Sequence, residues 1–130
     1  MDYVTKGYEP ADALKYFEEI SAIPRGSQNE AAVADYICEF AKAHGLEYYR
    51  DEVHNVIVKK PASKGCENVP PLMLQGHTDM VCVKLPEVEH DFTKDPLELE
   101  TKDGGLTAEG TTLGADDGMA CAYMLAFLAK

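Results

Sequence analysis

One apolar segment ends in an imidazole and a carboxylate. Residues 72–79 have the sequence LMLQGHTD, which places His77 two positions before Asp79. In a strand, side chains at i and i+2 point to the same face, so Asp79 can accept the second ring N–H of His77. That contact fixes the tautomer and makes the free ring nitrogen a better metal ligand. The pattern is short, and by itself it is more often a polar pair that satisfies a loop where a strand ends than a metal-binding histidine.

A second, glycine-rich segment carries two adjacent carboxylates. Residues 110–118 have the sequence GTTLGADDG, with Asp116 and Asp117 directly before an apolar helical pattern. One aspartate can cap the helix, but two neighbouring carboxylates repel unless a cation or a helix dipole offsets their charge. A carboxylate can also bridge two divalent ions about 3.5–4 Å apart. Metal binding and an ordinary acidic turn are both open for this pattern.

The remaining nucleophiles and metal-binding side chains show no comparable pairing. No two cysteines are spaced as C-x-x-C, so a zinc site of the finger type is not supported, and apolar flanks indicate reduced, mostly buried thiols. Neither Gly104-Gly105 nor the segment that begins at Gly110 matches a phosphate loop or a dinucleotide-binding motif. The groups set aside are Ser27, His44, His54, His90, Cys38, Cys66, Cys82 and Cys121.

The composition narrows the class of protein. The chain has 130 residues, 45% of them hydrophobic, which is enough for one folded domain or part of one. Its net charge of −11 repels phosphate backbones, so we do not expect a nucleic-acid partner. There is no apolar run long enough for a membrane span and no signal-peptide pattern at the N-terminus, so we expect a cytoplasmic protein without a membrane partner.

Two helices are predicted in the first third of the chain. Pro10 is suited to open a helix whose apolar residues follow helical spacing until the break at Pro24. A second helix is predicted over residues 28–44. Its start has the capping-box pattern of Ser27 and Glu30, and Gly45 is the natural residue after its end.

The following elements indicate an α/β fold. Strands are predicted at residues 46–51 and 53–59, and residues 71–75 suit an interior strand of a mixed or parallel sheet. A hairpin is predicted between residues 97–101 and 106–109, with its turn at 102–105. Residues 116–130 form a helix that is apolar nearly all round and should be buried.

Together, the two polar segments resemble the dizinc aminoacylase and carboxypeptidase superfamily. Residues 75–81 (QGHTDMV) and 110–118 carry this resemblance, and they stand in the same order as in that superfamily. Residues 23–27 (IPRGS), 55–58 (NVIV) and 90–97 (HDFTKDPL) extend it to the aminoacyl-histidine dipeptidase branch and over nearly the whole chain. The resemblance implies part of a three-layer α/β/α zinc-peptidase catalytic domain with a mostly parallel mixed sheet.

The resemblance also implies roles for individual residues. His77 matches the histidine that binds one zinc ion, and Asp116 matches the carboxylate that bridges two. Asp79 matches the catalytic acid that holds the imidazole. Asp117 would follow the bridging aspartate through a cis peptide bond and support the site from there. Gly118 agrees with the dipeptidase branch, whereas other branches often have lysine at this position.

The implied activity is hydrolysis of dipeptides of the Xaa-His type by a water that two zinc ions activate, with Co²⁺ or Mn²⁺ as alternative metals. The family also uses a Glu-Glu pair, as general base and zinc ligand, and then a further acidic ligand and a histidine. No such pair follows Asp116 in this chain. We therefore expect residues 1–130 to be the incomplete N-terminal part of a zinc-dependent peptidase catalytic domain, inactive alone.

A second interpretation is a non-catalytic α/β binding module that kept the scaffold. The apolar final helix stops without a glycine, proline or capping signal, which favours the incomplete domain. An incomplete domain would expose apolar surface and an unpaired sheet edge. We therefore expect the chain to self-associate as a dimer or larger species. A dipeptide is expected as a substrate only for the complete enzyme.

Overall fold

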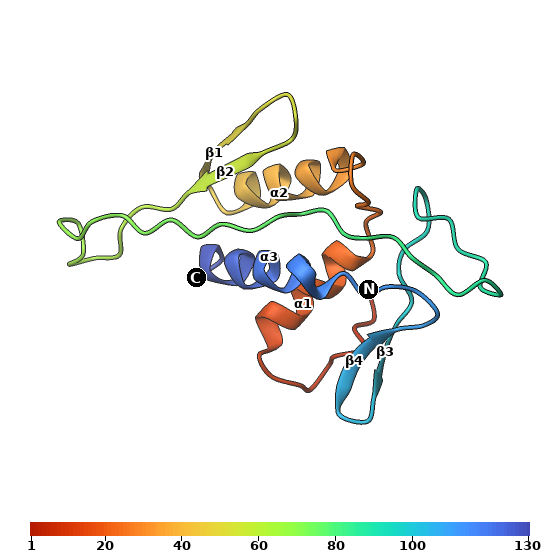
Figure 1. The fold of residues 1–130 in the computed structure, drawn as a ribbon. Coiled ribbons are helices and arrows are strands. Elements are labelled where there is room, and N and C mark those ends of the chain that lie inside the picture. The colour runs from red at the N-terminus through yellow and green to blue at the C-terminus, as the bar shows by residue number, and fades with distance from the viewer.

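The computed structural model describes residues 1–130, and it combines three helices with two separate β-hairpins (Figure 1). None of the helices is long and apolar enough to cross a membrane. In chain order the elements are α1 (Ala11–Ser21), α2 (Ala31–Ala43), β1 (Glu47–Arg50), β2 (Val56–Lys59), β3 (Leu99–Lys102), β4 (Gly105–Ala108) and α3 (Ala115–Leu128).

The hydrophobic core lies mainly between α1 and α3, which pack against each other in the lower part of Figure 1. Phe17 and Ile20 of α1 meet Ala122 and Leu125 of α3, and all four are buried. The apolar spacing in α1 predicted this buried face correctly. Pro10 stands at the N-cap of α1 with φ −79°, so the fixed backbone angle of proline starts the helix, as the sequence predicts.

The predicted start of α2 was wrong by three residues. The capping box would have placed the helix directly after Ser27, but α2 begins at Ala31. Gln28 has φ +69°, which no helix accepts, and its N–H donates to Glu30 Oε1 at 2.7 Å. The Ser27 hydroxyl bonds to Asp79 instead of the helix N-terminus, so it is not available as a cap.

The end of α2 is as predicted. Gly45 has φ +65°, which favours glycine, and its N–H donates to the carbonyl of Lys42 at 3.0 Å. The N–H of Leu46 donates to the carbonyl of Ala41 at 2.9 Å, which completes the glycine-based helix end. The chain then turns directly into the first hairpin.

The predicted hairpin is present as β3 and β4, and the two strands predicted before it are present as β1 and β2, which form a second hairpin and are shorter than expected. β1 pairs antiparallel with β2, and β3 pairs antiparallel with β4. The β3–β4 turn is formed by Asp103 and Gly104 at φ +51° and +76°. Two consecutive positive φ angles match the twist of the flanking strands, which is why an Asp-Gly pair predicts a tight hairpin.

The predicted interior strand at residues 71–75 is absent. Residues 71–75 are an extended, unpaired stretch, drawn in green in Figure 1, and the nearest strand-like contact along the chain is a parallel bridge between Met80 and Gly26. Leu72 and Met73 are 84% and 82% exposed. An interior strand needs neighbours on both sides, and no strand within residues 1–130 lies beside this one. The expected mostly parallel sheet of a three-layer domain is therefore corrected to a mixed α/β arrangement with two small antiparallel hairpins.

The final helix is buried on one side only. The face of α3 that contains Ala122 and Leu125 packs on α1, whereas Tyr123 and Phe127 are 43% and 58% exposed. The sequence predicted burial nearly all round, because the helix is apolar on every face. Within this chain, α1 covers only one of those faces.

Replacing Phe17 with alanine should test the α1–α3 core. Phe17 is completely buried, so the substitution removes a large apolar side chain and leaves a cavity. We expect Phe17→Ala to lower the free energy of unfolding by about 3–5 kcal/mol in urea titrations followed by circular dichroism. Tyr8→Ala, at a half-exposed position, is the control and should change stability little. Equal stabilities for both variants would contradict the assignment of this core.

The exposed, unpaired segment of residues 71–75 should make the isolated chain self-associate. Its apolar side chains are accompanied by unpaired backbone, which is a template for pairing with another chain. We expect a dimer or larger species by light scattering at tens of micromolar protein. The double variant Leu72→Lys, Met73→Lys should shift the mass towards the monomer. The control Val53→Lys, in the β1–β2 turn, should not. A clean wild-type monomer would contradict the expectation.

Candidate metal centre

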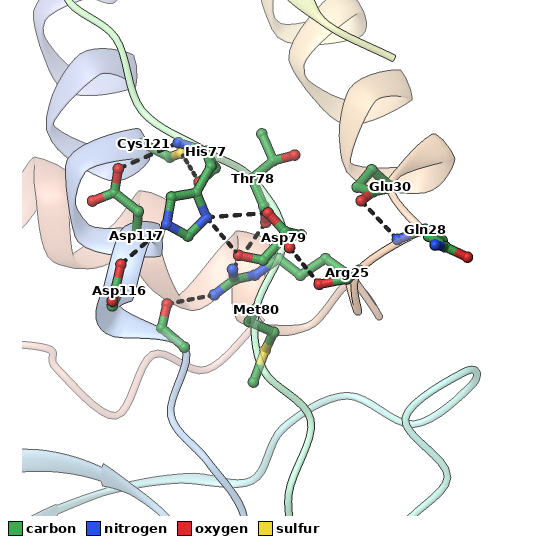
Figure 2. Close-up of polar contacts among 12 residues, drawn as sticks. Arg25, Gln28, Glu30, His77, Thr78, Asp79, Met80, Asp116, Asp117 and Cys121 are labelled. Atoms are coloured by element: carbon green, nitrogen blue, oxygen red, sulfur yellow. Dashed lines mark hydrogen bonds and ion pairs between the residues drawn. The ribbon is translucent and has the colours of Figure 1, made fainter. Parts of the chain in front are cut away.

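The His77 ring lies between two aspartates, as Figure 2 shows. Its Nδ1 is 3.1 Å from Asp79 Oδ1, and its Nε2 is 3.0 Å from Asp116 Oδ1. The predicted contact between His77 and Asp79 is therefore present, although the segment is not a strand. The contact with Asp116 joins two segments that are 39 positions apart in the chain. A neutral imidazole has one N–H, so only the protonated ring donates to both carboxylates at once.

The hydrogen bonds around His77 and Asp79 shift the pKa values of both groups towards their charged forms. Burial lowers the pKa of His77, but hydrogen bonds with Asp116 and Asp79 outweigh it and hold the pKa above the usual 6.5. The pKa of Asp79 is lowered, first by the hydrogen bond from Ser27 and then by the His77 ring. In the metal-free protein the site therefore favours an imidazolium between two carboxylates.

The two adjacent aspartates at the start of α3 point to different targets. The peptide bond that joins Asp116 to Asp117 is cis, as the resemblance implied, and neither residue has helical backbone angles. The Asp116 side chain is 95% exposed and turns to the imidazole. Asp117 Oδ2 accepts the backbone N–H of His77 at 3.3 Å. A Cβ at Gly76 would lie 2.6 Å from that same oxygen, so the close approach requires glycine there.

Two further residues hold the site and were missed from the sequence. The Ser27 hydroxyl donates to Asp79 Oδ2 at 2.5 Å and fixes the carboxylate that orients His77. Arg25 donates to backbone carbonyls on both sides of the site. The available signal was the place of both residues in the IPRGS stretch. Because Ser27 was predicted to cap a helix, its hydrogen bond to Asp79 was not expected.

The donor atoms fit two positions of a zinc site. Zinc binds imidazole nitrogen and carboxylate oxygen, and His77 Nε2 and Asp116 Oδ1 provide these at neighbouring places. Asp79 occupies the other ring nitrogen, which is the arrangement that orients a metal-binding histidine. Residues 1–130 contain no group of three or more His, Cys, Asp or Glu side chains placed to hold a metal ion. Catalytic zinc normally uses three protein ligands, so His77 and Asp116 would form only part of such a set.

Cys121 is close to the site but is not a suitable ligand. Its Sγ donates to the backbone carbonyl of His77 at 3.2 Å. Burial, and after it the carboxylate of Asp117, raises the pKa of this thiol to about 11. Metals bind the thiolate, so at neutral pH this buried thiol remains protonated and serves as a hydrogen-bond donor.

The other three histidines lie away from His77. The ring of His44 contacts the carbonyl of Phe40 at the end of α2, and His54 contacts Arg50 in the first hairpin. His90 packs against Phe92 in the long connection before β3. None of these rings contacts His77 or the aspartates around it.

No protein-family model matches the chain. Over 120 residues it is 45% identical to the cytosol non-specific dipeptidase of Escherichia coli (strain K12), a match that covers 92% of this chain and 25% of that protein. The structure matches the crystal structure of aminoacylhistidine dipeptidase from Vibrio alginolyticus with a TM-score of 0.93 and 41% identity. This match covers 99% of the chain and 26% of the solved one. The chain is therefore a partial homologue of the cytosol non-specific and aminoacylhistidine dipeptidases, and it spans about a quarter of their length.

Proposed function

We propose that residues 1–130 are the incomplete N-terminal part of a zinc-dependent dipeptidase catalytic domain. The observation that carries this proposal is the His77 ring held between Asp79 and Asp116. The match of 99% of the chain to an aminoacylhistidine dipeptidase supports it. The corresponding substrate is a dipeptide of the Xaa-His type, and the compartment is the cytosol that the name of the other relative specifies.

Each polar residue has a distinct task in this proposal. His77 Nε2 and Asp116 would hold zinc, with Asp116 shared between two ions, and Co²⁺ or Mn²⁺ could take the same oxygen and nitrogen donors. Zinc supplies a Lewis acid that polarises a peptide carbonyl and lowers the pKa of water. Asp79 would orient the imidazole as a carboxylate, and Ser27 holds Asp79 in place. Asp117 supports the backbone of His77.

A binding module without catalysis is the second candidate. Its support is the small number of suitable ligands, since no group of three metal-binding side chains is assembled. Such a module would keep the aspartate and histidine contacts as structural links between residues 76–80 and α3.

Zinc titration by calorimetry separates the two candidates. We expect wild-type protein to bind zinc weakly, because only two ligands are available, and the double variant His77→Ala, Asp116→Ala to lose this binding. A control variant, His54→Asn with Asp2→Ala, also removes one histidine and one aspartate but lies outside the site, and it should bind as wild type does. Identical titrations of wild type and the site variant would favour the binding module.

Catalysis should be absent in the isolated chain. Without the general base and the later ligands, we expect no hydrolysis of an Xaa-His dipeptide by pure, zinc-loaded protein. A rate that survives repeated purification and disappears in the His77→Ala, Asp116→Ala variant would overturn the statement that this part is inactive alone.

The protonation of His77 gives a prediction about pH. Because the folded pKa is raised, the ion pairs stabilise the metal-free protein fully below pH 6.5 and are lost as the pH rises through the folded pKa. NMR titration of the His77 ring should show a midpoint above 6.5, which Asp79→Asn should lower. Zinc must displace the ring proton, so its affinity should increase as the pH rises through this midpoint. A wild-type midpoint below 6.5 would contradict the geometry.

A further inference from the structure

Arg25 is the largest fully buried side chain of the protein, with 1% of its surface exposed. Its guanidinium lies between the two segments that carry the candidate ligands, as Figure 2 shows. Nη1 donates to the carbonyl of Thr78 at 3.0 Å, and Nη2 donates to the carbonyl of Gly114 at 2.9 Å. One contact is therefore one residue from His77 and the other is two residues from Asp116.

The main chain of Arg25 holds the same segment. Its carbonyl accepts the N–H of Met80 at 2.9 Å, and Gly26 forms a parallel bridge with Met80. The backbone thus fixes the extended segment just after Asp79, while the side chain reaches across to the start of α3. These contacts connect three parts of the chain through one residue.

Gly114 and Gly118, the outer glycines of the GADDG motif, pack closely against this guanidinium. A Cβ at Gly114 would lie 2.6 Å from Arg25 Nη2, and a Cβ at Gly118 would lie 2.7 Å from the same atom. The carbonyl of Gly114 also accepts the N–H of Gly118 at 3.0 Å. Both glycines are therefore required by close packing against Arg25, while the aspartates between them face His77 and its backbone.

Burying this charge is costly, so its presence needs an explanation. No carboxylate lies within ion-pair distance of the guanidinium, and the buried Nε–H has no hydrogen-bond partner. Burial lowers the pKa of Arg25, although the charge of Asp79 favours the protonated form. A well-packed apolar side chain would fill the space at lower cost in desolvation, but it could not hold two carbonyls at a fixed separation.

We propose that Arg25 is a positioning residue that sets the distance between His77 and Asp116. This inference rests on the proposed function, because its value to the protein is the placement of two metal ligands. The planar fork of the guanidinium bonds two carbonyls at once, whereas the ammonium of lysine concentrates its donors at one point. Arg25 does not contact substrate or metal in this proposal. It acts through the backbone next to each ligand.

The test uses Arg25→Met, Arg25→Lys and Gly118→Ala, with Arg50→Met as the matched control. Arg50 pairs with Asp35 and contacts His54, away from the site. The first measurement is made without metal: nuclear Overhauser effects between the His77 ring protons and the Asp116 side chain. The second is zinc affinity by calorimetry. Each variant is compared at a temperature where circular dichroism shows it folded.

We expect Arg25→Met to lose the contact between His77 and Asp116 and to weaken zinc binding about 10–100-fold, as supporting residues of metal sites typically do. Arg25→Lys should recover only part of either property, and Gly118→Ala should weaken both by displacing the guanidinium. Arg50→Met should leave both unchanged. If Arg25→Met does not fold, the lysine and Gly118→Ala variants decide the question.

A purely structural role would give a different result. Arg25→Met would then melt at lower temperature, yet below its melting point it would keep the wild-type contact and zinc affinity, and this would overturn the proposal. If wild-type protein binds no zinc at all, the proposed function fails, but the metal-free contact still decides whether Arg25 positions His77. The two failures are therefore distinguishable.

Discussion

The close approach of residues 76–80 to the start of α3 is the constraint on which the candidate site depends. A Cβ at Gly76 would lie 2.6 Å from Asp117 Oδ2, and a Cβ at Gly118 would lie 2.7 Å from Arg25 Nη2, so side chains fill the space beside both glycines. This approach lets the His77 ring reach Asp116 and lets Arg25 bond to carbonyls on both sides. The α1–α3 core holds the start of α3 in place, because Phe17 packs closely at Gly118, where a Cβ would lie 3.0 Å from its ring.

The site also has to balance like charges. Asp79, Asp116 and Asp117 bring three carboxylates near one imidazole and one buried guanidinium. A protonated His77 offsets part of this negative charge, which agrees with its raised pKa. A divalent cation bound to the neutral ring would contribute more positive charge than the proton it replaces. The arrangement that stabilises the imidazolium is thus also electrostatically suited to a metal, and a proton and a metal would compete for one nitrogen.

The sequence predicted correctly those features that depend on residues close together in the chain. The Asp-Gly turn of the second hairpin, the proline at the start of α1 and the glycine after α2 were all identified from residue type, since each fixes its own backbone angles. The contact of His77 with Asp79 depends on two-residue spacing and also survived. Non-local choices were missed: Ser27 bonds to Asp79 rather than to the helix end, and Arg25 reaches residues 53 and 89 positions away. Contacts between residues so far apart in the chain cannot be predicted from the periodicity of the sequence.

The strand prediction for residues 71–75 failed because these residues have no paired neighbour, and this affects how His77 is held. Residues 71–75 are apolar and extended, but their backbone has no paired neighbour, so the segment that leads to His77 is held mainly at its far end by Arg25 and Met80. A strand placed beside this segment would order it and pre-organise His77, without touching the metal itself. Pairing of the exposed edge and affinity for zinc should therefore be coupled. The coupling passes through the short stretch from His77 to Met80, where Arg25 fixes one end and α3 the other.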